Sequence, residues 1–181
     1  MTTLLYLPGL GSERLLKIQR RYLKWKCRKR GFELVFFESR WHDDEPYTEK
    51  WQRLLEDTTS TSAESTIVLA VSAGGALLTR FVSENPTVKS AHCMSAKLKN
   101  AEAIGSSYRK RAPALFDAVR ESQAVLGDMN LAEKTIVYRP LFDTVVPLKD
   151  MIIPGARRKR FFGFEHITAL IWALVFHFPK K

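Results

Sequence analysis

A serine stands where a predicted strand ends and a predicted helix begins. Residues 66–71 favour a buried strand, and Ser72-Ala73-Gly74-Gly75 opens the helical pattern that follows. A tight strand-to-helix turn has little room two residues before and after its central residue, where this chain has Ala70 and Gly74. The turn would place the hydroxyl at a helix N-terminus, where backbone N–H groups favour developing negative charge. Ser72 is therefore a candidate nucleophile, although a serine that only caps the turn would show the same pattern.

The segment from Ala70 to Gly74 resembles the nucleophile elbow of the α/β-hydrolase family, with alanine in place of the usual first glycine. In that family the serine is followed along the chain by an acid and then by a histidine. Asp143 lies in a Pro-Leu-Phe-Asp-Thr-Val-Val-Pro segment that is similar to the family's acid loop. His166 ends a Gly-Phe-Glu-His segment that is similar to its histidine loop. The resemblance implies Ser72 as nucleophile, Asp143 as acid and His166 as base.

The resemblance also implies an oxyanion hole made of two backbone N–H groups, those of Ala73 and Leu10. The loop from Leu7 to Ser12 is similar to the family's His-Gly-x loop, with proline in place of the histidine. Gly9 and Gly11 would let the backbone approach a substrate closely. A glycine-rich turn without a ligand is the alternative. No Gly-Lys-Ser/Thr follows, which excludes a phosphate-binding P-loop.

Short apolar runs alternate with helical patterns along the chain, which predicts a three-layer α/β sandwich with a mostly parallel sheet of about six strands. The expected strands are 3–7, 32–37, 66–71, 88–94, 135–138 and 158–162, and the expected helices are 12–30, 46–57 and 74–84. By resemblance, this is an α/β-hydrolase core that lacks the family's first two strands and orders its own as 2-1-3-4-5-6. The chain is most similar to the minimal, lidless bacterial serine esterases.

One domain spanning residues 1–181 is expected from the length and the even spread of apolar residues. The less regular segment 97–128 contains helical stretches, roughly 100–110 and 113–126, and could form a small cap over the site. The apolar run 167–178 is shorter than the roughly 20 residues that a membrane-spanning helix needs. We interpret it as a buried C-terminal helix.

The amino-acid composition further narrows the classes of protein to which the chain could belong. With only two cysteines and no Cys/His cluster, neither a disulfide framework nor a zinc module is expected. No export signal is recognised, so a cytoplasmic location is expected. The net charge of +10 admits anionic substrates and acidic partners, as well as nucleic acid or anionic membranes. Nine basic residues lie within 14–30 and four more within 157–160. A solvated surface explains them most simply, and nucleic acid or a membrane is the less favoured alternative.

Two further features lie near the predicted site. Trp41 follows the second strand and could line a substrate pocket, although core packing is the simpler role. His42, Asp43, Asp44 and Glu45 are contiguous, and contiguous side chains rarely converge on a metal, so we interpret them as a polar loop. No metal or cofactor is therefore expected.

Two classes of function follow from these features. The first is a serine hydrolase that cleaves carboxylic esters or thioesters, with small or short-chain acyl groups, through an acyl-enzyme. The second is a binding protein that keeps this fold with an idle triad and uses its basic face for a polyanionic partner. The oligomeric state stays open.

Overall fold

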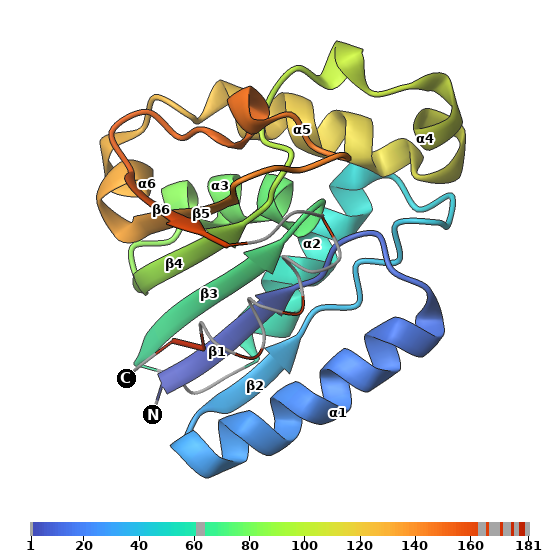
Figure 1. Cartoon of the computed structure of the whole chain (residues 1–181). Coiled ribbons are helices and arrows are strands. Elements are labelled where there is room, and N and C mark those ends of the chain that lie inside the picture. Colours follow the sequence, from blue (N-terminus) through green and yellow to red (C-terminus); the bar gives the residue numbers. More distant parts are fainter. Residues whose placement is uncertain are drawn as a thin grey trace.

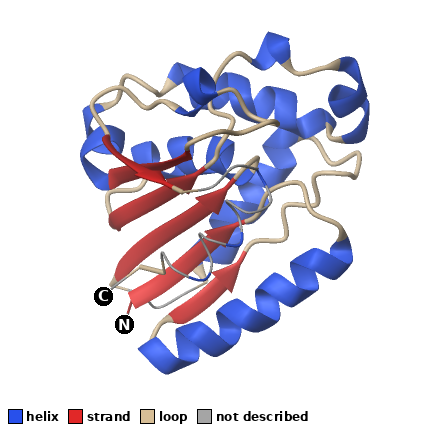
Figure 2. Ribbon diagram, viewed as in Figure 1, coloured by secondary structure: helices blue, strands red, loops and turns tan. Residues whose placement is uncertain are grey.

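The carboxyl ends of six parallel strands lie along one edge of a single sheet (Figures 1 and 2). The computed structural model describes residues 2–60, 64–162, 166, 171, 175, 178 and 179. The strand order is β2-β1-β3-β4-β5-β6, and each neighbouring pair is parallel, which confirms the expected topology. The strands are β1 (Thr2–Leu7), β2 (Glu33–Phe36), β3 (Ser65–Val71), β4 (Val88–Met94), β5 (Thr135–Pro140) and β6 (Arg157–Phe161).

Most helices agree with the sequence pattern to within a few residues, but the stretch expected over 100–110 divides into a short 3₁₀ turn and a helix that begins only at Ser106. The helices are α1 (Glu13–Arg30), α2 (Tyr47–Thr59), α3 (Gly74–Glu84), α4 (Ser106–Arg111), α5 (Pro113–Ala124) and α6 (Met129–Lys134), with short 3₁₀ turns η1 (Ala101–Ala103) and η2 (Leu148–Met151). The Ser12 hydroxyl caps α1 by accepting a hydrogen bond from Leu15 N–H. The sequence pattern missed α6, because six residues are too few to show a helical period.

Two hydrophobic clusters fill the spaces above and below the sheet. Leu5 and Leu7 of β1 pack with α2, α3 and α5, whereas Leu4 and Tyr6 point to the other face and pack against α1. Figure 1 shows α1 beside β2 at the outer margin of the molecule. Burial on both faces explains why the central strands β1 and β3 are nearly continuous apolar runs. The result is the expected three-layer sandwich.

Segment 97–128 joins the helical layer through α5, which packs on α3. Its α4 helix contains no buried residue. Whether this segment acts as a cap stays a prediction. The predicted C-terminal helix falls mainly on residues outside the described part of the chain. Among the residues that the structure does describe, no helix combines the length and the apolar character needed to cross a bilayer.

The first turn of α3 lies directly against the end of β1. A Cβ added to Gly74 would overlap the Leu7 carbonyl oxygen and would lie 2.8 Å from that of Pro8. Backbone atoms on both sides leave no flexible group that could move aside. The requirement for a small residue at this position is therefore a packing constraint between two elements.

We expect Gly74→Ala to lower the free energy of unfolding by about 3 kcal/mol, since the overlap can be relieved only by moving backbone. Gly127→Ala is the matched control, because nothing lies within 4 Å of its added Cβ. Urea unfolding of both variants checks this. Equal midpoints for the two would contradict the packing argument.

Candidate active site

Ser72 occupies a strained turn between β3 and α3. Its φ of 51° lies in the left-handed region, which costs a non-glycine residue about 1–2 kcal/mol. Two backbone hydrogen bonds hold this conformation: Ser72 N–H donates to the Met94 carbonyl (2.9 Å), and the Ser72 carbonyl accepts from Gly75 N–H (3.1 Å). Strain retained in this way is typical of functional turns.

The structure brings Ser72, His166 and Asp143 together into one hydrogen-bonded chain. The Ser72 Oγ lies 2.8 Å from His166 Nε2, and His166 Nδ1 lies 2.9 Å from Asp143 Oδ2. Ser72 and His166 are buried, and the Asp143 side chain is shielded from solvent. The three residues follow β3, β6 and β5, respectively. Because neighbouring parallel strands end at the same edge, residues far apart in sequence can meet there.

Asp143 is held as a carboxylate by its surroundings. Burial raises its pKa, but the hydrogen bond from His166 and those from Val146 and Val145 N–H (both 2.8 Å) outweigh burial and lower it below the usual range. An ionised carboxylate can only accept hydrogen bonds. Nδ1 of His166 therefore carries the proton, and Nε2 is free to accept the Ser72 hydroxyl proton.

This arrangement can activate a hydroxyl. A serine becomes a competent nucleophile when an adjacent imidazole removes its proton, and the carboxylate fixes the tautomer and stabilises the imidazolium. The observed distances lie within the 2.6–3.2 Å range that is typical for such a transfer.

The loop between β1 and α1 passes immediately beside the serine. A Cβ added to Gly9 would stand 2.7 Å from the Ser72 Cβ and 3.2 Å from its Oγ. Leu10, the next residue, packs partly against the core. Within the described chain, the N–H groups of Leu10 and Ala73 donate to no other backbone atom. Both predicted oxyanion donors thus belong to segments that flank Ser72.

A cavity of about 600 Å³ lies beside this loop. Gly9 and Gly11 form one wall, and Leu16 and Phe36 contribute apolar surface. Trp41 also lines it while remaining 2% exposed and packed in the core cluster. The Trp41 indole N–H donates to the Pro8 carbonyl (3.1 Å), so the tryptophan ties the cavity wall to the loop beside the serine.

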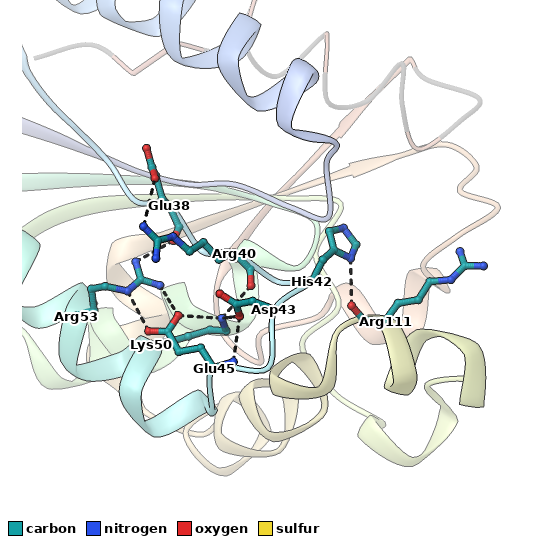
Figure 3. Close-up of polar contacts among 8 residues, drawn as sticks. All are labelled: Glu38, Arg40, His42, Asp43, Glu45, Lys50, Arg53 and Arg111. Carbon is teal, nitrogen blue, oxygen red and sulfur yellow. Dashed lines mark hydrogen bonds and ion pairs between the residues drawn. The ribbon is translucent and has the colours of Figure 1, made fainter.

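The polar loop after β2 is held by a buried lysine (Figure 3). The Lys50 side chain is fully buried, and its ammonium donates to the Arg40 carbonyl and to the carboxylates of Asp43 and Glu45. Arg53 adds two hydrogen bonds to Glu45 (2.7 and 3.0 Å). These carboxylates are therefore engaged in ion pairs, as expected of a polar loop.

Sequence reasoning missed Lys50, although a signal was present. Tyr47, Lys50, Trp51 and Leu54 follow the spacing of one helix face, and all four are buried. On the loop after β2, His42 Nδ1 lies 3.1 Å from the Arg111 carbonyl oxygen. This contact links the loop to α4 (Figure 3).

The Glu45 carboxylate supplies a pH-dependent test of this network. Its hydrogen bonds to Arg53 lower its pKa from 4.5 to about 2. Because the pKa of Glu45 is lower in the folded than in the unfolded protein, its ionised carboxylate stabilises the folded state. That stabilisation is complete above pH 4.5 and is lost as the pH falls toward 2. We expect Glu45→Gln to lower the melting temperature most at pH 6–7 and progressively less toward pH 3. Thermal unfolding at several pH values measures this, with exposed Glu49→Gln as control. A pH-independent difference would refute the role given to Glu45.

No protein-family model matches the chain, and no curated protein matches its sequence. Solved structures do match. One of two metagenome-derived lipolytic enzymes, LipS and LipT, gives a TM-score of 0.68 at 13% identity, over 93% of this chain and 86% of that one. Alpha/beta hydrolase domain-containing protein 10 from mouse gives 0.66 at 12% identity, over 92% of this chain and 82% of its own. The ydeN gene product from B. subtilis gives 0.66 at 14% identity, over 92% and 88%. Together with the sheet order and the strained turn at Ser72, these likenesses show that the chain has the fold of the α/β-hydrolase superfamily.

Proposed function

We propose that this protein is a serine hydrolase that cleaves carboxylic ester or thioester bonds through an acyl-enzyme. The observation that carries the proposal is the unbroken hydrogen-bonded chain from Ser72 through His166 to Asp143. Its members stand at three strand ends of an α/β-hydrolase fold. The lipolytic enzymes among proteins of similar fold support ester chemistry.

In the first half-reaction, Ser72 Oγ attacks the acyl carbon while His166 Nε2 takes the hydroxyl proton. The resulting tetrahedral intermediate collapses when the bond to the leaving group breaks, and His166 returns the proton to that group. In the second half-reaction, His166 deprotonates a water molecule that attacks the acyl-enzyme. The carboxylic acid leaves and Ser72 recovers its proton. Asp143 stays ionised throughout, and the reaction requires no metal or cofactor.

The negative charge of the tetrahedral intermediate would be stabilised by the N–H groups of Ala73 and Leu10. Ala73 precedes α3, so the positive end of that helix adds to the field. The close approach of Gly9 to Ser72 supports this assignment, because it brings the segment that carries Leu10 next to the reacting oxygen.

The cavity beside Gly9 suits a small or short-chain acyl or alcohol group. Its volume of about 600 Å³ falls within the range of small-molecule sites. Gly9, Gly11 and Trp41 would contact the substrate there. Because Trp41 is anchored by its hydrogen bond to Pro8, the wall of the pocket is held in place before substrate arrives.

A fluorophosphonate probe tests the mechanism directly, because it reacts with an activated serine. We expect one adduct on the native protein, detected by intact mass, and none on Ser72→Ala or His166→Ala. Hydrolysis of p-nitrophenyl acetate should fall by about 10⁴-fold or more in both variants. Denatured wild-type protein is the control for nonspecific labelling. Absence of an adduct on well-folded protein would refute the hydrolase and leave the idle-triad binding protein as the better account.

The space beside Ser72 offers a finer test. We expect Gly9→Ala to slow ester hydrolysis by about 100-fold, because the new Cβ must displace either the serine or the loop. Gly105→Ala is the control, since its Cβ would meet nothing within 4 Å and Gly105 does not line the cavity beside Gly9. Steady-state kinetics with a soluble ester compares the two. Equal rates would argue against the close approach.

A further inference from the structure

One side of α1 presents an apolar stripe to solvent. Leu15, Ile18, Tyr22 and Trp25 recur three or four residues apart, so their side chains follow one another along the helix. Leu15 is 41% exposed, Ile18 59% and Trp25 47%. The face of α1 that packs on the sheet is formed by Leu16, Leu23 and Cys27, and Tyr22, which is partly buried against the same cluster, lies at the margin between that face and the stripe. Exposed apolar residues gathered on one helix side often mark an interaction surface.

Basic side chains adjoin this stripe. Successive residues turn about 100° around a helix, which places Arg14, Arg21, Lys24 and Arg28 on the neighbouring side, and all four are exposed. Within the described chain, none of these four forms an ion pair. Glu13 is the one acidic residue of α1. The apolar stripe is thus bordered by positive charge that the described residues do not neutralise.

Two residues from the C-terminal part of the sequence contact the same helix. Lys26 Nζ donates to the Val175 carbonyl (2.8 Å) and lies 4.9 Å from the Phe178 ring centre, so Val175 and Phe178 are held against α1. The Val175 side chain is 44% exposed. Lys29 lies over the Trp25 ring at 4.4 Å. Apolar, aromatic and cationic groups therefore meet on one side of the molecule.

This combination favours a lipid surface over a nucleic acid. A polyanionic strand would engage the arginines and lysines but would leave aliphatic side chains such as Ile18 exposed to water. An anionic bilayer satisfies both features, because the stripe can enter the headgroup region while the cations meet lipid phosphates and carboxylates. Tryptophan also favours the membrane–water interface.

We propose that α1 is a membrane-docking helix that lies on the surface of bilayers containing anionic lipid. Leu15, Ile18 and Trp25 enter the interface, and Arg21, Lys24 and Arg28 bind the negative headgroups. Leu16 and Arg20, which line the cavity beside Gly9, lie on the side of α1 opposite the stripe, whereas Lys17, which also lines it, lies among the exposed cations. The stripe itself therefore does not cover the cavity.

Vesicle flotation with the full chain tests this proposal. The vesicles contain phosphatidylcholine with about 30% phosphatidylserine, and pure phosphatidylcholine vesicles are the comparison. We expect wild-type protein to float with the anionic vesicles and to be released as salt rises from about 0.1 M to about 0.5 M. The triple reversal Arg21→Glu, Lys24→Glu, Arg28→Glu should weaken partitioning by about 100-fold or more.

Two further variants distinguish binding through α1 from binding that depends only on the net charge of the protein. Lys89→Glu, Lys110→Glu, Lys149→Glu changes the net charge equally at exposed positions outside α1 and should bind nearly as wild type. Trp25→Ala should weaken binding by about tenfold without any change of charge. Circular dichroism verifies folding. Hydrolysis of a soluble ester should be the same in all variants, which keeps this proposal independent of the hydrolase mechanism.

Three results would overturn the proposal. One is failure of the wild-type protein to bind anionic vesicles. Another is equal loss of binding in both charge-reversal triples, which would mean that net charge alone drives association. The third is tight binding to duplex DNA or RNA that is insensitive to Trp25→Ala, with no vesicle binding, which would assign the basic face to nucleic acid.

Discussion

The packing of the β1–α1 backbone against the first turn of α3 is the contact on which the candidate site depends. A Cβ on Gly74 would overlap the Leu7 carbonyl and press on that of Pro8, and a Cβ on Gly9 would stand 2.7 Å from the Ser72 Cβ. Ser72 keeps a left-handed backbone because hydrogen bonds to Met94 and Gly75 hold it there. The serine and the loop beside it are thus one packed unit, so an oxyanion hole formed by them would be organised before substrate binds.

The surroundings of Asp143 complete the candidate site. Its carboxylate is buried, yet it accepts hydrogen bonds from two backbone N–H groups and from His166. Those donors replace the lost hydration and keep the group charged. A fixed negative charge on one side of the imidazole directs the other nitrogen toward Ser72. The hydrogen-bonded chain is therefore arranged for proton transfer from the Ser72 hydroxyl to His166 Nε2.

The chain uses its many cations in two different ways. Lys50 is buried and forms ion pairs with Asp43 and Glu45. It therefore holds in place the loop that contains Trp41, which lines the cavity. The arginines and lysines of α1 are exposed and lie beside apolar side chains. A buried, matched charge stabilises one loop geometry. Exposed charge next to exposed apolar surface suits association with a partner, which is the basis of the membrane proposal.

Local patterns in the sequence were sufficient to place the strands and the turn at Ser72, whereas the order of the sheet was predicted through the resemblance to the α/β-hydrolase family. Apolar runs indicate buried strands, and small residues indicate tight turns. Each of these signals lies within a short segment of the sequence. Asp143 and His166 could be named only through the resemblance to a known family. Whether they meet Ser72 depends on which strands are neighbours and how far each extends, and only the folded sheet decides that. The burial of Lys50, the anchoring of Trp41 and the exposed side of α1 likewise depend on contacts between distant segments. The tertiary structure alone determined these features, because the residues involved become neighbours only after the chain has folded.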